Sequence, residues 1–213
     1  ISTGAFSQNT KYIIQFHYKQ NLSTPDTASF VFISMDGTSA ARDKSNITLG
    51  TPASWTKFTK VVTTNGATTP TTNGVAGINI KLVGLADGIN SAVVDVDNFV
   101  VYKADNQTTP VADETAPANP GAAAVNNATA STLDINWGAS ANTDGGGYML
   151  VRYAANPSTE PNPVANAVYK AGNSIGNGTV VYIGTATTYT NVQLNSNTTY
   201  YYRVYTVDKA FNY

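Results

Sequence analysis

LNSNTTYYYRVYTVD, residues 194–208, carries four tyrosines within six residues and alternates between larger and more polar side chains. Successive side chains of a β-strand point to opposite faces, so Tyr200, Tyr202 and Val204 would share one face of a strand. The segment therefore predicts a strand, and it directs attention to the same alternation elsewhere in the chain.

Short alternating segments separated by DG, NG, DGGG and GNG turns run through both halves of the chain, and helical periodicity is almost absent. In residues 10–20 the alternation is clear on one face, which holds Tyr12, Ile14, Phe16 and Tyr18. The opposite face of the same segment holds Gln15, His17 and Lys19. Such strands and turns are typical of antiparallel sandwiches. We predict an all-β fold made of two tandem β-sandwiches.

A boundary lies in KADNQTTPVADETAPANPGAA, residues 103–123, which holds three prolines and few large apolar residues. This composition is typical of an extended linker. We expect a first domain at 1–104, a linker at 105–115 and a second domain at 116–213.

Composition narrows the functional classes. The 213 residues have 12% charged side chains, a net charge of −1 and no cysteine. The absence of cysteine excludes disulfides and zinc–thiolate sites, and the absence of a basic field argues against nucleic-acid binding. No apolar run reaches the length of a membrane span. A hydroxyl-rich, weakly charged chain of this kind favours a secreted or cell-surface protein.

The second half resembles a fibronectin type III domain. LDINW at 133–137 would supply a core tryptophan, and the family's L-x-P-x-T-x-Y-x-x-x-V pattern is matched by Leu194, Thr198, Tyr200 and Val204. The resemblance implies an Ig-like sandwich in which the Tyr200 hydroxyl reaches back to the backbone, as in a tyrosine corner. Residues 162–191 resemble a variant of secreted Bacteroidota proteins, in which a long insertion precedes a VVYxG strand. The family's last strand has no counterpart here.

The first half resembles the jelly-roll carbohydrate-binding modules of secreted bacterial glycoside hydrolases. The resemblance rests on TKYIIQFHYKQ (10–20), ASWTKFTKVVTT (53–64) and SAVVDVDNFVVY (91–102). It implies a partial jelly roll that lacks the opening strands. The aromatic residues at motif positions are expected in its core: Tyr12, Phe16, Trp55, Phe58 and Phe99.

Several candidate site residues follow from the strand alternation and from this resemblance. Glycan hydroxyls are expected to meet the polar side chains of one concave sheet face, namely Gln15, His17, Lys19, Asn79 and Lys81. The alternative for His17 is an ordinary surface histidine.

Calcium is a possible structural cofactor, because the resemblance places Asp97 at a position that often ligates it and Asp95 lies on the same face. The glutamate that would complete the set is missing, and the alternative is a solvated or hydrogen-bonded aspartate. Asp26–Ala28 resembles an O-glycosylation signal of Bacteroidota, with Thr27 as the acceptor.

Catalysis is not expected. His17 is the only histidine, and no nucleophile motif accompanies it. We expect a non-catalytic glycan-binding and spacer fragment of a larger secreted bacterial protein, with polysaccharide or a cell-surface glycan and neighbouring domains as partners. The alternative is a structural protomer of a cell-surface fibre or adhesin. Because sheet strands are missing from both resemblances, the chain is either an excerpt or completed by strands of a neighbouring subunit.

Overall fold

The structure is a computed structural model. It describes residue 7 and residues 9–20, 29–35, 45–48, 52–63, 78–84 and 94–213. For residues 29–35, 45–48 and 78–84, and for residues 20 and 94, it describes the backbone alone. The chain divides into two compact units, unit 1 at Ile1–Asp113 and unit 2 at Glu114–Tyr213. The boundary between them lies within the stretch in which we expected the linker.

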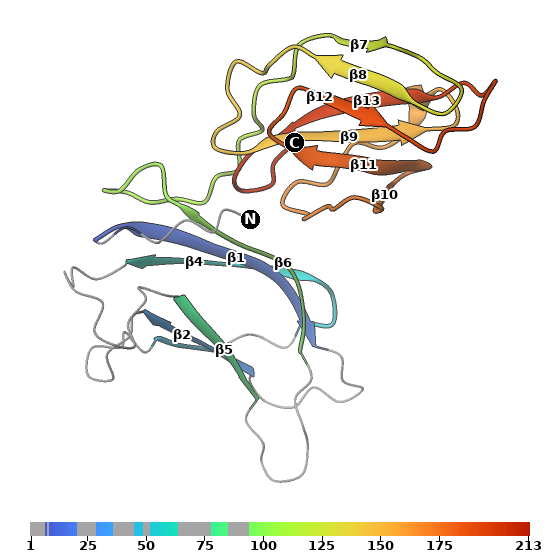
Figure 1. Ribbon diagram of the computed structural model, residues 1–213. Coiled ribbons are helices and arrows are strands. Elements are labelled where there is room, and N and C mark those ends of the chain that lie inside the picture. The colour runs from blue at the N-terminus through green and yellow to red at the C-terminus, as the bar shows by residue number, and fades with distance from the viewer. Residues whose placement is uncertain are drawn as a thin grey trace, which may run out of the picture. The chain divides into compact units, whose positions relative to one another are not determined.

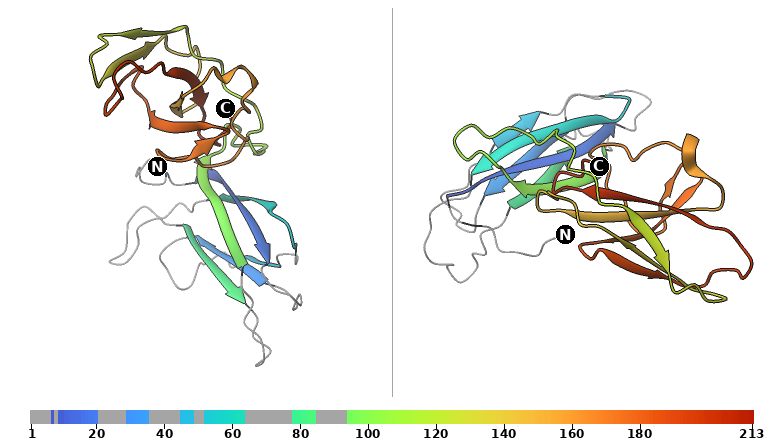
Figure 2. Two further views of the ribbon diagram at one scale, coloured as in Figure 1. Left: turned by 90° about the vertical axis from the view of Figure 1, so that its right-hand side faces the viewer. Right: turned by 90° about the horizontal axis from the view of Figure 1, so that it is seen from above.

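Unit 1 is built of six described strands in two antiparallel sheets (Figure 1). They are β1 (Lys11–Gln20), β2 (Ser29–Met35), β3 (Ser45–Thr48), β4 (Thr56–Thr63), β5 (Ile78–Gly84) and β6 (Val94–Lys103). One sheet has the order β4-β1-β6 and the other the order β3-β2-β5. Within unit 1 the two sheets are drawn as facing layers in Figure 2. Together with unit 2, this confirms the all-β prediction.

β1 is the central strand of its sheet, and the face predicted to be apolar lies in the core. Tyr12, Ile14, Phe16 and Tyr18 are all less than 9% exposed. Phe16 stacks on Phe58 of β4, with 4.6 Å between the ring centroids. Burial of a large apolar side chain contributes about 1.5–3 kcal/mol, so this stripe stabilises the sheet.

The opposite face of β1 is covered along its first half. Ile13 is fully buried, and Gln15 is only 2% exposed. The cover comes from the segment after β6, where the Gln107 side chain accepts the Lys11 N–H at 2.7 Å and donates to the Lys11 carbonyl at 3.1 Å. Farther along the strand this face opens, and its next two side chains are half-buried.

Unit 2 contains two further sheets and one short helix. Its elements are β7 (Ala123–Asn126), β8 (Leu133–Trp137), β9 (Gly147–Tyr153), the 3-10 helix η1 (Pro157–Thr159), β10 (Ser174–Ile175), β11 (Gly178–Gly184), β12 (Thr188–Asn191) and β13 (Tyr201–Val207). The sheet orders are β12-β8-β7 and β10-β11-β9-β13. All the pairings are antiparallel.

The two sheets of unit 2 enclose an aromatic core. Ile135 and Trp137 of β8 pack with Tyr148 and Leu150 of β9, and all four are buried. The Trp137 and Tyr148 rings meet edge to face with their centroids 5.7 Å apart. Aromatic pairs of this geometry add to the free energy that area burial alone provides. The predicted core position of Trp137 is confirmed.

A second cluster covers the other face of β9, so this strand is buried on both sides. Met149 and Val151 pack with Ile175 of β10, Val180 of β11 and Val207 of β13. The long stretch before β11 therefore contributes a core layer of its own.

Two polar contacts fix the edges of unit 2. The Tyr200 hydroxyl accepts the Asn195 N–H at 3.1 Å, five residues upstream, which is the contact expected of a tyrosine corner. On β13, the Arg203 guanidinium donates to the Glu160 carbonyl at 3.1 Å and to the Pro157 carbonyl, and so holds the segment that begins with η1. Both contacts use polar groups to lock loops onto strands.

Candidate binding face on unit 1

Several predicted site residues lie on the open half of β1 or beside it on β6, and the structure describes their side chains: His17, Lys19, Asp95 and Asp97. We define the Trp55 patch as the side chains of His17, Lys19, Trp55, Lys57, Asp95 and Asp97. In register, His17 lies between Lys57 of β4 and Asp97 of β6. Lys19 lies opposite Asp95. Three neighbouring strands thus place charged, hydrogen-bonding and aromatic groups on one sheet face.

Lys19 connects the acidic and the aromatic parts of the patch. Its Nζ is 3.5 Å from Asp95 Oδ2 and 5.0 Å from the centroid of the Trp55 ring. The side chains of Lys19 and Asp95 are 32% and 36% exposed. A pair this exposed contributes little to stability, about 0–1 kcal/mol, and the ammonium over the ring adds a cation–π attraction. The arrangement orients Lys19 rather than holding the fold together.

His17 owes its orientation to an irregularity in β6. The pairing of β1 with β6 shifts between Gln15 and His17, and Asn98 has a positive φ of 53° there. Bulges of this kind re-aim side chains. As a result, Asn98 Nδ2 lies 3.4 Å from His17 Nδ1. An imidazole that accepts the amide N–H through Nδ1 carries its proton on Nε2, which can then donate to a ligand.

The electrostatic environment favours neutral His17. Burial, followed by the positive charge of Lys57, lowers the pKa of the His17 imidazole below its ordinary value, against a smaller opposite effect of Asp97. At neutral pH the patch therefore combines two ammonium groups, two carboxylates and an uncharged imidazole.

Gln15 alternates onto the same face of β1, but its side chain is buried and hydrogen-bonded. Its Oε1 accepts the Tyr102 hydroxyl at 2.8 Å, its Nε2 lies 3.4 Å from Thr59 Oγ1, and the side chain is 2% exposed. A buried and bonded amide is not presented to a ligand, so the expected glycan contact of Gln15 does not fit its position. The physical reason is the cover over this half of the strand, because the Tyr102 hydroxyl also accepts the Asp113 N–H at 3.0 Å.

The remaining glycan candidates lie in the other sheet of unit 1. Asn79 and Lys81 pair with Ser34 and Phe32 in the β2–β5 ladder. They do not lie on the sheet that contains His17 and Lys19, so the five expected residues do not share one face. Thr27 lies outside the described residues.

The two predicted calcium ligands are on neighbouring positions of one strand face, but both already have partners. Asp95 faces the Lys19 ammonium, and Asp97 Oδ1 accepts the Asn98 N–H at 2.7 Å. A calcium ion needs six to eight oxygen ligands. At this place the ion would compete with the Lys19 ammonium for the carboxylate of Asp95.

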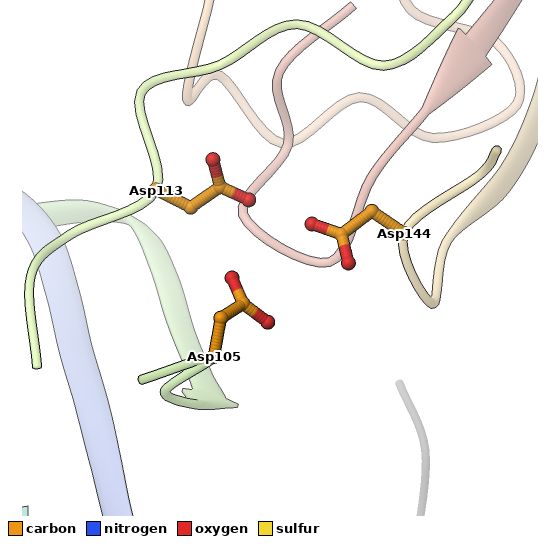
Figure 3. A group of neighbouring side chains, drawn as sticks. All are labelled: Asp105, Asp113 and Asp144. Carbon is orange, nitrogen blue, oxygen red and sulfur yellow. The ribbon is translucent and has the colours of Figure 1, made fainter. Parts of the chain in front are cut away.

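Figure 3 shows three other carboxylates, those of Asp105, Asp113 and Asp144. Asp105 and Asp113 belong to the segment after β6 in unit 1. Asp144 belongs to unit 2, where it forms an ion pair with Lys209 at 3.0 Å. Because these carboxylates belong to two different units, we assign no metal site to them.

Sequence reasoning missed two residues of the patch, Lys57 and Trp55. Trp55 was expected in the core with Phe99, but the two residues are 47% and 46% exposed. Because Thr56 pairs with Tyr18 on the apolar face, the residue before it is directed to the opposite face, beside Lys19. The strand alternation, applied one residue before the first position of β4, could have revealed this.

Comparisons with known proteins do not assign the chain to a family. No protein-family model matches the chain, and a search of the curated proteins found no match. Among the residues that the structure describes, no helix has the length and apolarity that a membrane-crossing helix requires.

Proposed function

We propose that the chain is a non-catalytic glycan-binding and spacer part of a secreted or cell-surface bacterial protein. Unit 1 binds polysaccharide or a cell-surface glycan. Unit 2 is a fibronectin type III-like spacer that keeps unit 1 apart from a neighbouring domain. The proposal combines a sequence resemblance with the geometry of one sheet face.

The observation that carries it is the open half of the β4-β1-β6 sheet. His17 and Lys19, two residues singled out for hydrogen bonding to sugars, lie there side by side, and both are half-buried. Lys57 and Asp97 flank His17 on the adjacent strands. Sugar hydroxyls both donate and accept hydrogen bonds, and a face that offers ammonium, imidazole and carboxylate groups together meets both needs.

A non-catalytic role is supported by the surroundings of His17. Its Nδ1 faces the Asn98 amide, whereas the base of a hydrolytic triad is oriented by a carboxylate and faces a nucleophile. For unit 2, a spacer role is supported by its tightly bonded loops, such as the turn in which Asp208 accepts the N–H groups of Ala210 and Asn212.

Binding of polysaccharides by the full chain tests this function. We expect retention on at least one immobilised polysaccharide and a loss of affinity of about tenfold or more in the double variant His17→Ala/Lys19→Ala. Lys170→Ala, an exposed lysine of unit 2, is the matched control and should bind as the wild type does. An array of plant, algal and bacterial glycans with no binding would overturn the proposal.

A second candidate function, a protomer of a cell-surface fibre, is favoured by one observation. β13 is an outer strand of its sheet, because it pairs with β9 and, within the described residues, with no other strand. Outer strands accept further strands from other chains. Light scattering and electron microscopy of the purified chain test this: ordered filaments support the fibre, and a monodisperse monomer at high concentration contradicts it.

A further inference from the structure

The strand β13 of unit 2 has one side without a partner strand. It pairs with β9 on one side and, within the described residues, with no strand on the other. On such an edge the backbone N–H and C=O groups of every second residue point outward. An extended polypeptide offers amide and carbonyl groups at the matching spacing. The edge is therefore a template for one further strand.

A cavity of about 160 Å³ lies next to the last residues of this edge. Tyr205 and Thr206 of β13 line it, together with Asn119, Asn162, Tyr213 and two prolines. Asn119 and Asn162 are exposed and contribute amide donors and acceptors. None of these lining residues, all of which the structure describes, is charged. The cavity thus favours an uncharged group that forms hydrogen bonds.

Thr206 is the lining residue that points most directly to a ligand. It is 3% exposed, and its Oγ1 has no hydrogen-bond partner among the described residues. A buried hydroxyl without a partner costs free energy, and most buried polar groups of native proteins are bonded. A ligand group that donates to or accepts from this hydroxyl would remove that cost.

The core face of unit 2 is also open at β7, the strand that follows the cavity-lining segment at 117–119. Val125 of β7 pairs directly with Ile135, so the two side chains lie on the same face of their sheet. Ile135 is fully buried, whereas Val125 is 52% exposed. An occupant of this edge can therefore bury apolar surface in addition to forming backbone hydrogen bonds.

We propose that unit 2 binds an extended segment of another polypeptide, which pairs with the outer edge of β13 and inserts a serine, threonine or asparagine side chain into the cavity beside Thr206. This inference goes beyond the spacer role proposed for unit 2. It does not depend on glycan binding by unit 1.

The charges at the site specify the partner. A charged side chain would lose its hydration in a cavity that offers no opposite charge, so the inserted side chain is uncharged. Antiparallel pairing of two β13 strands about Val204 would make their Arg203 side chains diagonal neighbours on one sheet face. Such like charges disfavour a second copy of this chain as the occupant. The edge is therefore assigned to a different polypeptide.

The probe for the test is a library of random linear peptides, displayed on phage and selected on the full chain. We expect the enriched peptides to share a serine, threonine or asparagine flanked by alternating apolar residues. The best peptide, added to the full chain, should shift the NMR amide signals of β13 and leave those of β12 in place. Failure to enrich any peptide, or shifts centred away from β13, would overturn the proposal.

Two threonine variants test the cavity. Thr206→Val keeps the shape of the side chain and removes the hydroxyl, which has no partner in the free chain. The Tm should therefore not fall, whereas the affinity for the peptide should fall about tenfold through the loss of one buried hydrogen bond. Thr188→Val, an exposed position on the outer strand β12, is the matched control and should bind as the wild type does.

Two outcomes would contradict the assignment of the site. An affinity of Thr206→Val within twofold of the wild type would show that the peptide does not use the cavity. Shifts of the β13 amide signals that grow with protein concentration in the absence of peptide would show that a second copy of the chain occupies the edge.

Discussion

The two halves of β1 show how one strand face can serve two purposes. Ile13 and Gln15 are buried in the first half, whereas His17 and Lys19 remain half-exposed in the second. All four alternate onto the same side of the sheet. The difference comes from the segment after β6, which covers the first half and leaves the second half open. Side-chain alternation determines the face, but a distant segment determines whether that face is core or surface.

The largest effect should come from truncating the covered half. Ile13→Ala removes a fully buried side chain, and we expect the free energy of unfolding of unit 1 to fall by about 2–5 kcal/mol. Lys19→Ala, on the open half, should change it by no more than about 0.5 kcal/mol. Urea unfolding of the full chain measures both. Equal costs for the two variants would show that the halves do not differ as described.

Weakening the contact of the segment after β6 with β1 should have an intermediate effect on the free energy of unfolding. Gln107→Ala removes the bonds to both backbone groups of Lys11 and to the Ala104 carbonyl. We expect a loss of about 1–3 kcal/mol, because the partly buried Lys11 N–H and Ala104 carbonyl lose the Gln107 side chain as a partner. Lys103→Ala, an exposed neighbour, is the control. Faster amide exchange at Ile13 and Gln15 in Gln107→Ala, with His17 and Lys19 unchanged, would tie the effect to the covered half.

The open half should respond to pH through His17. Its pKa is lowered in the folded state, so the folded state disfavours the charged imidazole. The stability that neutral His17 provides is therefore complete above its ordinary pKa of 6.5 and is lost as the pH falls through the lower folded value. Thermal unfolding between pH 8 and 5 should show a smaller decrease in His17→Gln than in the wild type. Identical pH profiles would contradict the described environment.

The smallest effect concerns calcium. We expect millimolar calcium to leave the Tm of the wild type unchanged, because the Lys19 ammonium lies 3.5 Å from Asp95 Oδ2. Lys19→Met removes this competitor, so any calcium-dependent rise in Tm should appear in that variant alone. A rise in the wild type would show that the ion displaces Lys19 and would restore the predicted calcium site.

Local pattern sufficed for the parts of the fold that depend on neighbouring residues. The alternation predicted the buried face of β1, and the spacing of Leu194 and Tyr200 predicted a hydroxyl that reaches back to the backbone. All-β architecture followed from turns and strand period together. None of these features requires knowledge of which distant segments meet.

The site was harder to predict because it depends on distant contacts. Gln15 is buried, and its Oε1 accepts a hydrogen bond from the hydroxyl of Tyr102, 87 residues away. No local pattern reveals that partner. Asn79 and Lys81 were assigned to the wrong sheet surface because strand period gives no information on which strands pair. Trp55 was misplaced because a motif position was given more weight than its alternation with Thr56.

The most direct test of the account is a chemical-shift map of the full chain titrated with the oligosaccharide that binds best. We predict that the shifts centre on Trp55, His17 and Lys19, and that Ile13 and Gln15 on the covered half of the same face show none. Shifts that centre on unit 2, or that spread equally over both halves of β1, would contradict the claim that the open half is the binding surface.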